Sequence, residues 1–216
     1  MQKCLLRIAC ALCVLLNAGY VRAAPMGFED SWMAMGDVSE TWREGWVNYA
    51  FTARDAVGVG YVQMKSDDKS KDRKLAEVNY TRLLHRWNLP SAQANVWLFA
   101  SVGSMTGNDF SGSKTAYAPG VQLDYETTRV YFAATSRLYR AEGIRHDFNS
   151  VRAGFSFYTA DYEDTQPWLV VEARRMRDLS DETEITPMLR FINKKYFVEF
   201  GINNNREPKF SFMYIF

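Results

Sequence analysis

The chain has 216 residues, of which 47% are hydrophobic, and its 26 lysines and arginines nearly balance 25 aspartates and glutamates. This balance excludes the strongly basic surface that a nucleic-acid-binding protein needs. After the first 23 residues, no uninterrupted apolar run reaches the roughly 18 residues that a transmembrane helix requires.

The first 23 residues have the organisation of an export signal. Lys3 and Arg7 supply the positive charge, and residues 8–16 form an apolar stretch that is too short to remain in a bilayer as a helix. Val21-Arg22-Ala23 then places small residues where a signal peptidase needs them. We therefore expect a cleaved signal peptide at 1–23, with cleavage after residue 23 or 24.

All three cysteines, Cys4, Cys10 and Cys13, lie within that signal. The mature chain would then contain no disulfide, no thiolate metal site and no cysteine nucleophile, which suits passage through an oxidising periplasm. Cleavage also removes three basic residues, so the 26 basic residues fall to 23 against 25 acidic ones. The rest, 24–216, is predicted to be one domain, because no linker or repeat divides it.

From residue 28 onward, the pattern is one of strands separated by polar turns. Tyr, Phe, Val and Thr are abundant, and no apolar face persists with helical spacing. The alternation predicts strands at 28–36, 42–53, 56–65, 73–87, 93–105, 115–126, 129–140, 149–160, 167–177, 184–192, 195–203 and 208–216. The first of these is the least regular, since residues 27–36 barely alternate.

The connections fall into two classes. Short turns are predicted near 54–55, 88–90, 127–128, 161–166 and 193–194. Longer polar loops are predicted at 66–72, 106–113, 141–148, 179–183 and 203–207. The two classes largely alternate, as in barrels with short periplasmic turns and longer outer loops. Two termini on the periplasmic side require an even strand number, so we expect twelve strands, with ten as the alternative.

The last strand carries the clearest signal. Phe210, Phe212, Tyr214 and Phe216 repeat with period two, so in an extended strand they share one face. On a soluble protein this would be an open aromatic edge prone to aggregation. In a barrel wall the same face is solvated by lipid, and the strand closes against the first one.

This strand, with its C-terminal Phe, resembles the last strand of bacterial outer-membrane β-barrel proteins. The resemblance implies an all-β, closed antiparallel transmembrane β-barrel in the outer membrane of a Gram-negative bacterium. It also implies that the four aromatic residues form the signal read by the outer-membrane assembly machinery. The expected partners are outer-membrane lipid and lipopolysaccharide, the assembly machinery and periplasmic chaperones, but no nucleic acid. The oligomeric state stays open.

Alternation also predicts which side chains face inward. Apolar sets such as Val121, Leu123 and Tyr125 should face lipid, because a charge there costs about 2–4 kcal/mol at the midplane. A soluble sandwich with the apolar sets inward is the alternative that the signal and the terminal Phe oppose. The lumenal set then contains Glu77, Asn79, Thr81, Asp124, Glu126, Arg137, Arg152, Glu172, Arg174, Arg190 and Glu199.

The lumenal set contains both signs of charge. Interior charges must pair, so we expect arginines 137, 152, 174 and 190 to pair with Asp124, Glu172 and Glu199. A selective pore would show one dominant sign. The mixture favours a structural or surface barrel with a charge-paired, plugged lumen. A narrow porin-like diffusion channel for small solutes is the alternative.

An outer-membrane hydrolase at the barrel rim is a third hypothesis, ranked lower. Neither His85 nor His146 is followed two residues later by serine, and the glycine pair at 103 and 107 has Met105 at its centre instead of a nucleophile. The Asp/His candidate is His146-Asp147 in the predicted external loop, with Asp109 as a possible third member. Because such pairs are common in polar loops, we expect no catalytic residue. Without HExxH or similar spacing, we also expect no metal or cofactor.

Overall fold

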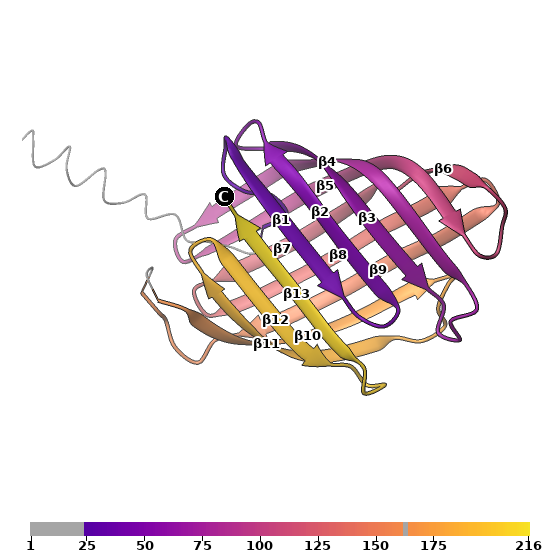
Figure 1. The fold of residues 1–216 in the computed structure, drawn as a ribbon. Helices are drawn as coiled ribbons and strands as arrows, with labels where there is room; N and C mark the ends of the chain where they lie inside the picture. Colours follow the sequence, from indigo (N-terminus) through magenta and orange to yellow (C-terminus); the bar gives the residue numbers. More distant parts are fainter. Residues whose placement is uncertain (1–23, 162–163) are drawn as a thin grey trace, which may run out of the picture.

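The computed structural model describes residues 24–161 and 164–216, so the expected signal peptide lies outside the described residues. The described residues form antiparallel β-structure (Figure 1). The strands are β1 (Ser31–Val38), β2 (Trp42–Ala50), β3 (Asp55–Lys65), β4 (Asp72–Leu89), β5 (Ala92–Gly107), β6 (Ser113–Tyr117), β7 (Gly120–Thr127), β8 (Val130–Ala141), β9 (Ile144–Phe155), β10 (Gln166–Arg177), β11 (Glu184–Asn193), β12 (Tyr196–Ile202) and β13 (Pro208–Ile215). Within these residues, no helix is long and apolar enough to cross a membrane.

The sheet closes on itself where β1 pairs with β13, with Met33 opposite Ile215 and Val38 opposite Phe210. We call this pair the closure seam; Figure 1 shows it as the indigo strand beside the yellow one. Both β6 and β7 pair with β5 and β8, and only Ala118-Pro119 separates them, so they form one barrel strand. The chain is therefore a closed antiparallel transmembrane β-barrel of 12 strands. The prediction of twelve strands is confirmed, and the ten-strand alternative is wrong.

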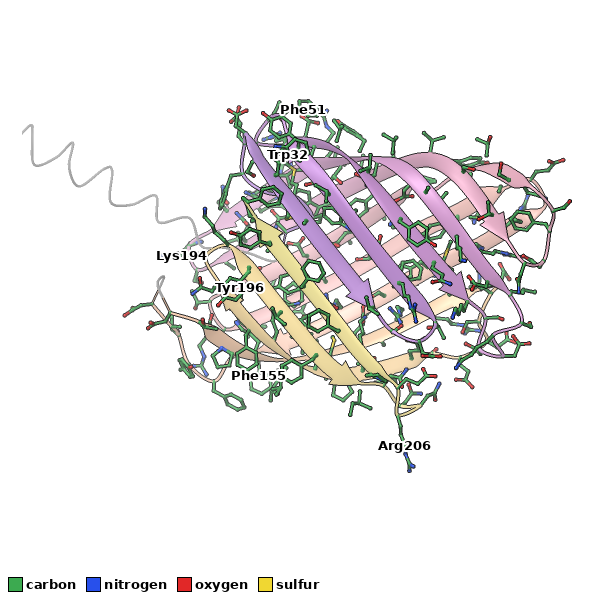
Figure 2. The ribbon with its side chains drawn as sticks, in the orientation of Figure 1. Trp32, Phe51, Phe155, Lys194, Tyr196 and Arg206 are labelled. Carbon is green, nitrogen blue, oxygen red and sulfur yellow. The ribbon has the colours of Figure 1, made fainter. Side chains whose placement is uncertain are left out.

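The two ends of the barrel differ. Phe216 and Trp32 exchange backbone hydrogen bonds of 2.9 Å, which places both chain ends of the barrel together at what we call the terminal end. Figure 2 shows Trp32, Phe51 and Lys194 at this end and Arg206 at the opposite one, the loop end. The loop end carries the connections 66–71, 108–112, 178–183 and 203–207.

One predicted strand is displaced along the sequence. β9 spans Ile144–Phe155, whereas alternation predicted 149–160, so the external loop predicted at 141–148 is wrong. The chain instead turns within two residues, where Gly143 adopts φ +69°. Glycine reaches this region without strain, and tight hairpins require it. The polar pair His146-Asp147 suggested a loop, but both residues lie in the strand.

Inside and outside are sharply divided. The outer surface carries exposed apolar side chains on every wall, including Val59, Leu123, Val151 and Ile202. The last strand follows the same rule, since Phe210, Phe212, Tyr214 and Phe216 all face outward and are 38–54% exposed. Three hydrophobic clusters fill much of the interior. Their largest fully buried side chains are Met33, Met64, Leu75, Trp97, Met105, Tyr139, Phe197 and Met213.

Candidate functional site: the charged lumen

A first charge cluster joins opposite walls of the barrel. Arg137 projects inward from β8 and binds Glu44 of β2 through Nη1, at 2.8 Å, and Glu77 of β4 through Nη2, at 3.0 Å. Ser101 of β5 donates to the second Glu77 oxygen at 2.6 Å. Two barrel strands separate β8 from β4, and four separate it from β2, so the arginine reaches across the lumen.

A second cluster centres on Glu199 of β12. Arg190 of β11 binds its Oε1 at 2.6 Å, and Arg152 of β9 donates to its Oε2. The Arg190 guanidinium lies 4.5 Å from the ring centroid of Tyr131 and 5.2 Å from that of Phe197. Aromatic faces attract cations most strongly where water is excluded, so the arginine is held by a carboxylate and two rings together.

A third cluster crosses the closure seam. Lys209 of β13 binds Glu172 of β10 and lies 3.2 Å from Asp37 of β1. Arg174 of β10 binds Glu184 at 2.5 Å and lies 3.5 Å from the same Asp37. The first strand, the last strand and β10 thus share one group of charges.

The predicted role of Asp124 as an arginine partner is wrong. Its carboxylate accepts hydrogen bonds from Asn95 Nδ2 at 2.5 Å and from Trp97 Nε1 at 2.7 Å. Arg86 donates instead to the Asn95 oxygen, at 2.7 Å. Glu126 follows Asp124 on the same inward set of β7, nearer the terminal end, opposite Gln93 of β5. Neutral donors can hold a carboxylate, a possibility that pairing by charge alone overlooks.

The three clusters together form what we call the charge layer. The sequence analysis missed several of its members. Lys209 could have been found, because it alternates with the outward Phe210 and must therefore face inward. Asp37 and Glu44 could not have been found in this way. Met35 and Trp42 face the same side as these carboxylates, so apolar and polar residues do not alternate along β1 and β2.

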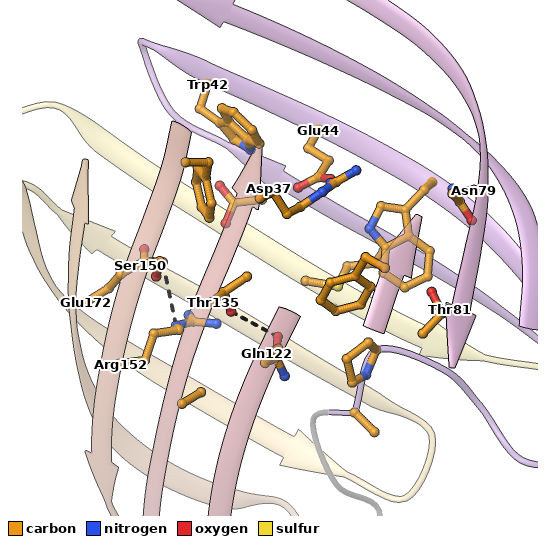
Figure 3. Close-up of a pocket in the computed structure, with 18 of the residues that line it drawn as sticks. Asp37, Trp42, Glu44, Asn79, Thr81, Gln122, Thr135, Ser150, Arg152 and Glu172 are labelled. Carbon is orange, nitrogen blue, oxygen red and sulfur yellow. Dashed lines mark hydrogen bonds and ion pairs between the residues drawn. The ribbon is translucent and has the colours of Figure 1, made fainter. Parts of the chain in front are cut away.

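A cavity of about 150 Å³ lies within this charge layer (Figure 3). Asp37 and Glu44 approach it from one wall, and Arg152 and Glu172 from another. Towards the terminal end the lining includes Ala24 and Pro25, which precede the first strand.

The segment before β1 fills part of the terminal mouth. Asn48 of β2 donates to the Pro25 carbonyl oxygen at 3.2 Å. Met26 is buried against Ala50, Leu83 and Trp97, all of which face inward. Chain that is not part of the barrel wall therefore occupies part of the lumen at this end.

Of the hypothetical rim hydrolase, His146 and Asp109 both contact Arg73, which lies between them, and Asp147 points away from His146. His146 is fully buried inside the barrel, where Arg73 Nη1 donates to its Nδ1 at 3.3 Å. The ring proton therefore lies on Nε2, which is 3.1 Å from Met64 Sδ. Asp147 faces the opposite side of the strand, and Asp109 binds Arg73 at 2.6 Å. In the described part of the chain, no group of three or more His, Cys, Asp or Glu residues is placed to hold a metal ion.

The described residues form a closed 12-strand barrel. Its wall turns apolar side chains outward, and its paired charges face inward. The fold is that of bacterial outer-membrane β-barrels. Similar solved structures include the KdgM porin in complex with disordered oligogalacturonate, with 12% identity over 85% of this chain and 98% of that chain and a TM-score of 0.48.

OccK8 of Pseudomonas aeruginosa is also similar, with 8% identity over 81% of this chain and 57% of that chain and a TM-score of 0.41. A loop-deletion mutant of OmpT from Vibrio cholerae is similar with 8% identity, 86% and 97% coverage and a TM-score of 0.30. No family model and no curated protein matches the chain.

Proposed function

We propose that this protein is an outer-membrane barrel with a closed, charge-paired lumen, which serves as a structural or surface barrel and not as an open pore. The observation that supports this most is the burial of the lumenal charges. Glu199, Arg190, Lys209 and Glu172 are 0, 2, 2 and 4% exposed. Charges that line a water-filled channel would be in contact with that water.

Energetics point the same way. A buried ion loses its hydration and is tolerated only when it is paired and hydrogen-bonded. Here Arg137, Arg152 and Arg190 each bind a carboxylate within the lumen. A permeating ion would have to separate such pairs. Because positive and negative side chains are mixed through the lumen, no continuous row of one charge would guide an ion across.

The outer surface supports the location. The exposed apolar belt matches the lipid-facing band of a transmembrane barrel. The expected export signal and the C-terminal Phe216 both fit outer-membrane delivery. In such barrels short turns face the periplasm and longer loops face outside, so we assign the terminal end to the periplasm and the loop end to the exterior.

Conductance of the folded protein tests the proposal. The refolded chain, with its fold verified by heat-modifiable migration on gels, is added to planar bilayers and recorded channel by channel. We expect no steady conductance above the bare bilayer. Steady, reproducible conductance from the folded protein would overturn the closed lumen and favour the narrow diffusion channel.

The terminal mouth favours one second candidate, a channel gated by the segment before β1. Part of the cavity is lined by Ala24 and Pro25 and not by the barrel wall. A refolded chain that begins at Glu29 removes this segment and leaves every strand intact. Conductance in this chain alone would favour the gated channel, whereas silence in both chains would favour the permanently closed barrel.

A further inference from the structure

One side of β4 has no partner strand near the terminal end. β3 begins at Asp55, which pairs with Arg82. The next residue of β4, Leu83, donates from its amide to the Arg54 carbonyl oxygen at 2.7 Å. Beyond this bond β4 continues through residues 84–89, whose pairing partners all lie on β5. We call the other side of residues 84–89 the free edge, because no strand of the described chain pairs with it.

The step between β3 and β4 is local to this pair of strands. On the other side of the β4–β5 hairpin, β5 and β7 are level, since Ala92 pairs with Thr127 at their ends. The step begins at a β-bulge between Leu83 and His85. Bulges are over-represented at sheet edges, where they re-aim a side chain or end the pairing of two strands. The free edge therefore starts at a defined irregularity of β4.

The outer face beside the free edge is apolar and aromatic. Leu84, Trp87 and Leu89 are each about half exposed there. The ring of His85 lies 4.2 Å from that of Trp87, whereas Arg86 turns inward and donates to a side chain of β5. Cross-strand neighbours on one face of a sheet stabilise each other. A strand added at this edge would therefore gain packing against Leu84 and Trp87.

The free edge lies beyond the aromatic residues at the boundary of the membrane. Trp32, Tyr49 and Tyr80 belong to one row of cross-strand partners, which Val57 completes. Aromatic residues form such girdles at membrane interfaces. β4 runs from Tyr80 towards the terminal end, which places residues 84–89 on the periplasmic side of this row. Open sheet edges do not occur in the hydrocarbon region, whereas an edge in water is a template for a further strand.

Direction and charge restrict what can occupy the edge. A second copy cannot pair antiparallel with it, because β4 runs in the same direction in every copy inserted in one membrane. An added antiparallel strand runs as β3 does, so its C-terminal end arrives at the turn between β2 and β3. This turn carries exposed Arg54, next to the pair that Arg82 and Asp55 form at 3.1 Å. Two guanidinium groups thus accompany one carboxylate, and the excess positive charge favours an anionic group at that end of the added strand.

We infer that the free edge binds an extended segment of a periplasmic partner protein by strand addition. The segment runs antiparallel to β4, packs alternate apolar side chains on Leu84 and Trp87, and places a carboxylate beside Arg54. In such complexes main-chain hydrogen bonds supply the affinity, and side chains at alternate positions supply the specificity. The edge exists only after β3 and β4 have paired, so this partner recognises the folded barrel, unlike the expected assembly machinery and chaperones. The inference goes beyond the proposed function, because it does not depend on whether the lumen conducts.

Hydrogen exchange tests strand addition. The protein is refolded, checked by heat-modifiable migration and placed in phospholipid nanodiscs, and the probe is a short synthetic peptide that alternates valine and threonine and ends in a free carboxylate. We expect the amides of residues 84–89 that do not pair with β5 to exchange fast alone and slowly with excess peptide. The same peptide with N-methylated amides should not slow them, since its backbone cannot donate. Slow exchange without peptide, no slowing with it, or equal slowing by both peptides would each overturn the inference.

Two variants test the side chains through the peptide concentration that slows exchange. Arg54→Gln should bind the free-acid peptide about threefold more weakly, as for an exposed charge pair, and a C-terminally amidated peptide as wild type does. Arg206→Gln, the matched control, removes an exposed arginine at the loop end and should leave both affinities unchanged. Trp87→Ala should weaken both peptides alike, because it removes packing. Equal weakening in Arg54→Gln and Arg206→Gln, or full affinity in Trp87→Ala, would overturn the assigned strand direction and packing.

Discussion

Gly36 of β1 and Phe212 of β13 are direct partners across the closure seam, and the phenylalanine ring covers the bare backbone of the glycine. A Cβ atom at Gly36 would lie 2.4 Å from Phe212 Cε1. Glycine within a strand often marks such a close approach, and an aromatic ring laid over it restores contact that the missing side chain would have made. The seam thus depends on a small residue at one particular position.

Replacing Gly36 with valine should impair closure of the barrel. The new side chain would collide with the Phe212 ring, so we expect a smaller folded fraction in heat-modifiable gels after refolding. Gly45→Val is the matched control: Gly45 pairs with Gly36 on the other side of β1, and the nearest atom to its Cβ is Met35 O at 3.9 Å. Equal folded fractions for the two variants would contradict this account of the seam.

The outward row of the last strand should be needed for assembly in cells. Phe212→Asp places a charge on the lipid-facing wall, at a cost of up to about 2–4 kcal/mol near the midplane. We expect less folded protein in the outer-membrane fraction for this variant and for deletion of Phe216. Phe212→Leu keeps the surface apolar and should assemble. If Phe212→Asp assembled as well as wild type does, the outward row of the last strand would not be part of the signal that the assembly machinery reads.

Arginines of the lumen should contribute far more stability than exposed ones. Arg190→Ala and Arg152→Ala each remove one partner of the buried Glu199 carboxylate. We therefore expect the free energy of unfolding in urea to fall by about 3–5 kcal/mol. Arg82→Ala breaks an exposed pair with Asp55 and should leave the unfolding midpoint nearly unchanged, because water screens such pairs. Small, equal losses in all three variants would show that the lumen is hydrated. Arg174→Ala should behave like the other lumenal variants.

A loop carboxylate provides a pH test outside the barrel wall. Hydrogen bonds from Ser66 and Ser70 lower the pKa of Asp68 to about 2. Because this pKa lies below the ordinary value of 3.8, the stabilisation it reports is present above pH 4 and is lost as the pH falls through about 2. NMR titration of the carboxyl carbon should show this midpoint. Ser66→Ala should move the midpoint upward, and an unchanged value would rule out the serine as its cause.

Local alternation predicts which way each side chain points, and little beyond that. It places the outward belt and the inward charges correctly, because lipid and a packed lumen impose opposite demands on neighbouring residues. It does not predict that Arg137 meets Glu44 across the lumen, 93 residues away. That contact depends on barrel diameter and stagger. β9 was misplaced for a related reason: Asp147 is tolerated on the outer wall only because Arg140 and Arg177 flank it.

The position of Lys209 has a consequence for the order of assembly. It belongs to β13, and its partners Glu172 and Asp37 lie on β10 and on the first strand. Until β13 docks, both carboxylates lack their lysine, and the interior cannot dehydrate around them without a penalty. Completion of the wall and neutralisation of the interior therefore happen in one step. A chain without β13 would leave Asp37 and Glu172 without their lysine, so the charged interior depends on the same strand that completes the wall.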